Sequence, residues 1–127
     1  MSDRHFRILV VEDEPLIRWS IAETLGEEGH TVMEAADAAS AVRTLEEAGS
    51  VDVVLLDYRL PDSDDLGLLT QVRRLQPESA VVMMTADGSA DLTQRALALG
   101  AYRVVGKPFD MHTLESLVVE ASDARVH

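Results

Sequence analysis

The chain has 127 residues, of which 46% are hydrophobic and 27% are charged, a balance typical of one soluble globular domain. Its 11 lysine and arginine residues stand against 23 aspartate and glutamate residues, so the formal net charge is −12 and direct binding to nucleic acid phosphates is not expected. Cysteine is absent, which excludes disulfides, thiol nucleophiles and cysteine-based metal sites.

Five short apolar runs alternate with five longer amphipathic stretches. In chain order, strands are expected at 6–11, 31–35, 51–56, 80–85 and 101–105, because these runs are rich in valine and contain no proline. The amphipathic stretches predict helices that begin with one between Pro15 and Gly29 and continue at about 38–45, 66–75, 92–99 and 114–121. This alternation predicts an α/β fold with a five-stranded, doubly wound parallel sheet and helices on both faces.

The length and the single series of elements predict one domain over 1–127. Its core is expected at about 6–121, and residues 122–127 lack an apolar pattern, so they are interpreted as a tail or the stub of a linker. The strand at 31–35 is more polar than the others and is expected at an edge of the sheet.

The apolar runs are too short for targeting or membrane segments. None approaches the roughly 18 residues of a membrane span. The first run is also too short for a signal peptide and is followed by three acidic residues. We therefore expect a cytoplasmic protein without a membrane contact.

Polar side chains follow four of the expected strands, at the ends that meet at one edge of a doubly wound sheet. Glu12 and Asp13 follow the first strand and Asp57 the third, Thr85 ends the fourth, and Lys107 comes after the fifth. Each residue alone is typical of a helix cap, a loop cap or a surface charge. Three carboxylates within a few Å, however, repel each other by about 4 kcal/mol per pair at an effective dielectric of about 20. The group therefore needs a cation.

The donor set predicts Mg²⁺ as that cation. Oxygen ligands without histidine or cysteine, in a site open to water, suit Mg²⁺ better than a closed Ca²⁺ cage. The acidic run at 62–65 lacks the later glutamate of a calcium loop and is interpreted as a turn and helix start. In such a site Asp57 can attack phosphorus, the metal and Lys107 can neutralise the equatorial oxygens, and Thr85 can hydrogen-bond to one of them.

Four motifs resemble those of the response regulator receiver domain, the phosphoacceptor of two-component signalling, in order and spacing over about 6–121. They are VVEDE, LLDYRLPDSD, MMTA and GAYRVVGKPF. The resemblance implies a flavodoxin-like fold with strand order 2-1-3-4-5. It also implies a phosphoryl donor, either a sensor histidine kinase or a phosphotransfer protein.

The resemblance further implies roles for individual residues. Mg²⁺ would be bound by Asp13, Asp57 and the backbone carbonyl of Arg59, with Glu12 acting mostly through water. The peptide bond between Lys107 and Pro108 would be cis, which is inexpensive only before proline.

Two positions depart from the family pattern. Asp65 stands where the family usually has glycine, so a strained backbone with positive φ is expected there. Val104 stands three residues before Lys107, where the family usually has a tyrosine or phenylalanine that swings inward as the threonine moves toward the phosphoryl group. Tyr102, two residues earlier on the same expected strand face, is considered as a substitute but is interpreted as an ordinary strand or loop aromatic.

Three further residues have candidate roles at the surface. Arg59 and Asp87, two residues after Asp57 and Thr85, are expected to line the mouth of the site and to tune dephosphorylation and donor access through their charges. Trp19 is interpreted as helix packing, with a docking face for the kinase as the alternative.

The favoured function is a switch and not an enzyme that acts on other molecules. Phosphorylation of Asp57 would alter dimerisation or partner binding, with the face formed by 92–99, 101–105 and 114–121 as a candidate homodimer surface. One alternative is a receiver-like interaction module that works without phosphorylation. Another is a phosphatase of the haloacid dehalogenase type, which would need a second aspartate where Arg59 stands and a later acidic pair.

Overall fold

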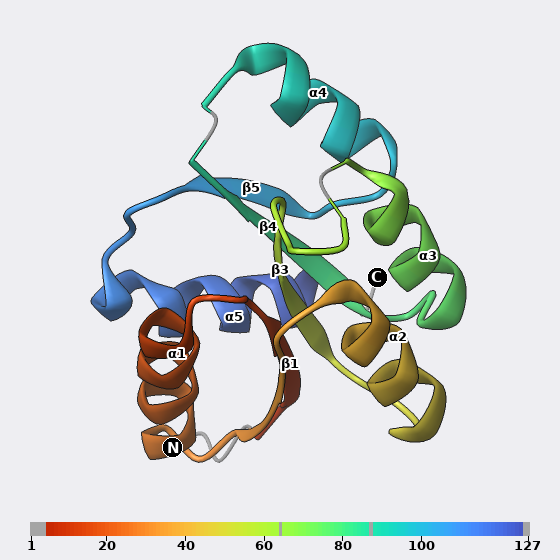
Figure 1. The fold of residues 1–127 in the computed structure, drawn as a ribbon. Coiled ribbons are helices and arrows are strands. Elements are labelled where there is room, and N and C mark those ends of the chain that lie inside the picture. Colours follow the sequence, from red (N-terminus) through yellow and green to blue (C-terminus); the bar gives the residue numbers. More distant parts are fainter. Residues whose placement is uncertain (1–4, 64, 87, 126–127) are drawn as a thin grey trace.

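Strands and helices alternate along the chain. The computed structural model describes residues 5–63, 65–86 and 88–125 (Figure 1). In this part of the chain the elements are β1 (Arg7–Val11), α1 (Pro15–Glu27), β2 (Thr31–Ala35), α2 (Ala38–Glu47), β3 (Val53–Asp57), α3 (Gly67–Leu75), β4 (Ala80–Thr85), α4 (Ala90–Ala98), β5 (Arg103–Gly106) and α5 (Met111–Arg125). The ten predicted elements are confirmed, with shifts of a few residues at their ends.

All neighbouring strands are parallel, in the order β2-β1-β3-β4-β5. This order confirms the predicted flavodoxin-like, doubly wound sheet. The polar strand β2 lies at an edge, as expected from its sequence. β3 lies at the centre, and all five of its residues are buried.

The core has two halves, one on each face of the sheet. Figure 1 shows α1 and α5 on one face and α2, α3 and α4 on the other. Val53 and Leu55 of β3 pack with the α1 and α5 side chains, whereas Val54 and Leu56 pack with those of the other three helices. Each such side chain stabilises the fold by about 1.5–3 kcal/mol through burial. The last residue of β3 is therefore held on a strand that is anchored from both faces.

The first helix does not bury all of its apolar residues. Ile21 and Leu25 are buried and Ile17 packs against the same cluster, which is a spacing of four residues on one helix face. Leu16 is 76% exposed and Trp19 is 58% exposed. The packing interpretation of Trp19 is therefore wrong, because this side chain lies outside the row that faces the sheet.

The last helix is longer than the sequence predicted. α5 continues to Arg125, and Ser122 is only 2% exposed. Residues 122–125 are thus part of the helix and not a tail, and the small polar Ser122 continues the packed face after Ala121 without a visible apolar pattern. Residues 126 and 127 lie outside the described residues. In the described part of the chain, no helix has both the length and the hydropathy to span a membrane.

The loop after β3 is closed by local hydrogen bonds. Leu60 and Ser63 exchange backbone hydrogen bonds of 2.8 and 3.2 Å. Asp65 accepts a hydrogen bond from the backbone N–H of Gly67 through Oδ1 at 2.8 Å, at the start of α3. Among the described residues only glycines have positive φ, so the strain expected at Asp65 is not found. This side chain closes the turn from an ordinary backbone conformation.

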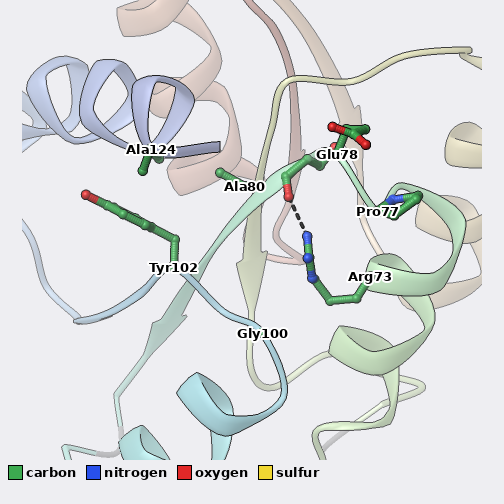
Figure 2. Close-up of a pocket in the computed structure, with 9 residues that line it drawn as sticks. Arg73, Pro77, Glu78, Ala80, Gly100, Tyr102 and Ala124 are labelled. Carbon is green, nitrogen blue, oxygen red and sulfur yellow. Dashed lines mark hydrogen bonds between the residues drawn. The ribbon is translucent and has the colours of Figure 1, made fainter. Parts of the chain in front are cut away.

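A hollow of about 210 Å³ lies at the amino-terminal ends of β4 and β5, far from the strand ends that carry the acidic residues. Figure 2 shows Arg73 reaching from α3 across this region. Its Nη1 donates a hydrogen bond to the carbonyl of Ser79 at 2.6 Å. The Arg73 side chain passes so close to Gly100 that a Cβ added at Gly100 would lie 2.8 Å from Nε of Arg73. Gly100 also has a φ of +107°. Both the backbone and the close contact therefore require glycine.

We expect Gly100→Ala to destabilise the protein by about 1–3 kcal/mol, because it adds backbone strain and displaces Arg73. Gly26 in α1 is the matched control, since a Cβ there meets nothing within 4 Å and its φ is not positive. Gly26→Ala should be neutral or stabilising by up to about 1 kcal/mol. Urea unfolding of the three proteins measures both effects. Equal stability of Gly100→Ala and wild type would contradict the prediction.

Candidate functional site

The predicted site residues converge at the carboxyl edge of the sheet. Glu12, Asp13, Asp57, Thr85 and Lys107 all line one cavity of about 280 Å³, together with Glu14, Arg59 and Ala86. One carboxylate oxygen from each of Glu12, Asp13 and Asp57 lies within 4.8 Å of the others. The strand ends bring these residues together because parallel strands finish at the same edge.

Glu12 is fully buried and is held by its neighbours. Its backbone N–H donates to the carbonyl of Ala35 at 3.0 Å, which extends the pairing of β1 with β2. Its Oε2 accepts a hydrogen bond from the backbone N–H of Glu14 at 3.0 Å. Asp13, the next residue, is exposed toward solvent. The loop after β1 thus places the buried carboxylate of Glu12 beside the exposed carboxylate of Asp13.

Lys107 forms ion pairs with two carboxylates of the site. Its Nζ lies 2.7 Å from Oε1 of Glu12 and 3.1 Å from Oδ2 of Asp57. Burial alone would lower the pKa of the Lys107 ammonium, but the two carboxylates outweigh this effect and the pKa is raised. The backbone N–H of Lys107 donates to the carbonyl of Thr85 at 2.7 Å, and the peptide bond to Pro108 is cis, as predicted.

Asp57 is 5% exposed, and its carboxyl is difficult to ionise. Burial and the nearby Glu12 raise its pKa to about 6, although Lys107 and the backbone N–H of Arg59 act in the opposite direction. One lysine therefore does not balance the carboxylates. The residues fit a divalent cation, which prefers oxygen ligands. The buried Oε1 of Glu12 supports this fit, because it forms an ion pair with Lys107 but accepts no hydrogen bond of ordinary geometry.

We expect Asp57→Asn to stabilise the metal-free protein by up to about 3 kcal/mol near neutral pH. Because the folded pKa is about 6 and the ordinary value is 3.8, the folded chain holds this proton more tightly than the unfolded chain. The stability that comes from this group is complete below pH 3.8 and is lost as the pH rises through about 6. The variant should therefore match wild type near pH 3.8 and exceed it above about pH 6, measured by urea unfolding in EDTA. A difference that does not change with pH would contradict this prediction.

Val104 and Tyr102 pack on opposite faces of the sheet, in contrast to the expected arrangement. Thr85 is 3% exposed at the end of β4, and Val104 packs with the cluster on the α2, α3 and α4 face. Tyr102 packs with the opposite cluster, and Figure 2 shows its ring directed toward Ala124 of α5. The expectation that Tyr102 shares a sheet face with Val104 is wrong, because Tyr102 precedes β5 and is outside its strict alternation.

The mouth of the site is described only in part. Arg59 is exposed and lines the cavity, as expected. Its backbone N–H donates to Oδ1 of Asp57 at 3.3 Å. Asp87 lies outside the described residues.

Sequence reasoning missed a contact that holds the loop after β3. Both carboxylate oxygens of Asp62 accept backbone hydrogen bonds at the start of α2, from Ala38 at 2.8 Å and Ala39 at 3.1 Å. A carboxylate suits the positive end of a helix, but the helix that Asp62 caps starts 24 residues earlier in the chain. Only the tertiary structure identifies this partner.

The family model described as "Response regulator receiver domain" matches residues 8–119. A transcriptional regulatory protein of Mycobacterium tuberculosis, TcrA, is 40% identical over 108 residues, which are 85% of this chain and 42% of that protein. PdtaR of the same species is 37% identical over 111 residues, covering 85% of this chain and 52% of that protein. The DNA-binding transcriptional regulator NtrC of Escherichia coli is 33% identical over 114 residues, which are 90% of this chain and 24% of that protein. This chain thus spans about half or less of these relatives.

Solved structures show the same architecture. A receiver domain protein described as CheY-like, from Methanospirillum hungatei, superposes with a TM-score of 0.90 and 28% identity, covering 97% of this chain and 98% of that one. The beryllofluoride-activated receiver domain dimer of NtrC4 superposes with a TM-score of 0.87 and 30% identity, covering 94% of this chain and 98% of that one. Both are similar to this chain over nearly its whole length.

Proposed function

Since this chain belongs to the response regulator receiver family, we propose that it is a phosphorylation-dependent switch whose phosphoacceptor is Asp57. The family is a signalling domain and not a classical enzyme. The observation that carries the proposal is the convergence at one cavity of Asp57, a lysine 3.1 Å from its carboxylate, and two further acidic residues. The family match favours this function over the haloacid dehalogenase type of phosphatase.

The phosphoryl donor in this proposal is a phosphohistidine on a sensor kinase or a phosphotransfer protein. An oxygen of Asp57 forms a bond to phosphorus while the bond between phosphorus and the donor's imidazole nitrogen breaks, and that nitrogen is left with the electron pair. Lys107 would neutralise one phosphoryl oxygen, and the Thr85 hydroxyl would donate a hydrogen bond to another. We place the protein in the cytoplasm with its donor.

Glu12, Asp13, Asp57 and the backbone carbonyl of Arg59 would hold Mg²⁺, with Glu12 acting mostly through water. When bound, the ion supplies positive charge that offsets the carboxylates and the phosphoryl oxygens. Asp57 is already fixed by β3 and Lys107, so this chain orients the nucleophile without a large rearrangement.

The output of the switch would be a change in association. The α4, β5 and α5 face is the candidate homodimer surface, and Leu97 of α4 is 44% exposed there. Support comes from the NtrC4 receiver domain, whose beryllofluoride-activated form is described as a dimer. Val104 leaves this face without the family's usual aromatic side chain, so the surface change must come from other side chains.

The test is incubation with acetyl phosphate, with either Mg²⁺ or EDTA, followed by intact mass measurement and sedimentation velocity. We expect one phosphoryl group with Mg²⁺ and none with EDTA, and a change in sedimentation with beryllofluoride. An adduct without any change in association would support phosphorylation and contradict dimerisation as the output. Absence of both the adduct and beryllofluoride binding would favour an interaction module that works without phosphorylation.

A further inference from the structure

The backbone of Glu12 is held at both its N–H and its carbonyl. Its backbone N–H donates to Ala35 and its Oε2 accepts from Glu14, as described above, while its Oε1 has only the ion pair with Lys107. Its backbone carbonyl accepts a hydrogen bond of 2.8 Å from Nη1 of Arg18 in α1. A fixed carbonyl fixes the peptide plane that follows it, because the peptide bond is planar. That plane leads directly into Asp13, the exposed carboxylate of the site.

Arg18 closes the loop between β1 and α1 from both ends. Its side chain binds the carbonyl of Glu12 at the start of the loop, and its backbone N–H donates to the carbonyl of Glu14 at the end, at 2.9 Å. Its Nε donates to Oε1 of Glu34 on β2 at 3.2 Å, which anchors the guanidinium on the neighbouring strand. The Arg18 side chain is 21% exposed, so solvent screens these contacts only in part.

We propose that Arg18 is a positioning residue for the cation site. It holds the Glu12 carbonyl so that Asp13 stays directed toward the carboxylates of Glu12 and Asp57. This inference rests on the proposed function, because it requires that the acidic cluster binds Mg²⁺. Arg18 itself contacts none of the reacting groups.

The direction in which one substitution changes the affinity for Mg²⁺ distinguishes a positioning role from a purely electrostatic one. Arg18 is a cation near a cation site, so its charge alone weakens Mg²⁺ binding, and loss of that charge should tighten binding. Loss of a contact that orients a ligand weakens binding instead, commonly by about tenfold or more. We therefore expect Arg18→Met to raise the dissociation constant for Mg²⁺ by about tenfold, measured by calorimetry without a phosphoryl donor.

Two further variants separate the effect of the guanidinium contacts from the effect of charge. Arg18→Lys retains the charge but cannot bind Glu12 and Glu34 with a guanidinium fork, so we expect an intermediate dissociation constant. Arg43→Met is the matched control, because it removes the same charge from an exposed side chain whose hydrogen bond is to Ser40 at 3.3 Å. Its dissociation constant should remain that of wild type or fall slightly. Circular dichroism of each variant establishes that it is folded.

A second measurement distinguishes orientation of the cation site from general damage. The rate of phosphorylation by acetyl phosphate should need more Mg²⁺ for half-saturation in Arg18→Met, but should approach the wild-type rate at saturating Mg²⁺. Unchanged or tighter Mg²⁺ binding in folded Arg18→Met, or, if that variant does not fold, wild-type binding in Arg18→Lys, overturns the inference. Wild type that binds no Mg²⁺ overturns the proposed function itself, and with it this role.

Discussion

Asp57→Asn will acquire no phosphoryl group from acetyl phosphate and Mg²⁺, whereas wild type will acquire one. The asparagine amide has a similar shape but lacks the anionic oxygen that attacks phosphorus. Glu12 does not replace Asp57, because it is fully buried and its oxygens face Glu14 and Lys107. Intact mass at matched times measures the difference, and hydroxylamine should remove the wild-type adduct because an acyl phosphate is labile to it.

Asp91→Asn is the matched control for this prediction. The Asp91 side chain is 80% exposed on α4 and pairs only weakly with Arg95 at 3.5 Å, so its loss should leave phosphorylation unchanged. Wild-type incorporation in Asp57→Asn would assign the acceptor to another residue. An equal loss in both variants would indicate that the assay reports general acidity and not the site.

The sheet and the acidic edge were predictable because their signals are local. Valine-rich runs end on Asp57 and Thr85, and any parallel arrangement brings such ends together. The strand order needed the family resemblance, since alternation alone permits several orders. The charge balance at the edge was also predictable, as a single lysine among three carboxylates is visible in the sequence.

Other features depend on contacts that no local pattern contains. Trp19 is apolar but lies outside the buried row of α1, and Ser122 is polar but buried. Asp62 binds the first backbone N–H group of α2, which lies 24 residues earlier in the chain, and Arg18 binds a carbonyl at the other end of a loop. Residue type indicates what each group can bind, whereas the partner is set by tertiary packing.

Lys107→Met will change two properties of the site in opposite directions. Phosphorylation by acetyl phosphate should slow by about 100-fold or more, because a charge that stabilises the phosphoryl oxygens is lost. Mg²⁺ should bind about tenfold more tightly, because the ammonium 2.7 Å from Glu12 and 3.1 Å from Asp57 no longer repels the incoming cation. Calorimetry and intact mass measure the two effects on the same sample.

The opposite signs make this substitution a strict test of the charge balance. A variant that is merely misfolded should lose both Mg²⁺ binding and phosphorylation, so tighter binding with slower transfer cannot come from damage. Arg103→Met is the control, since Arg103 is a half-exposed cation on β5 that pairs with Glu120 at 3.3 Å, and both properties should stay at wild-type values. If Lys107→Met binds Mg²⁺ more weakly than wild type, the lysine supports the metal site and does not compete with it. The excess of carboxylates around Asp57 would then need a different counter-charge.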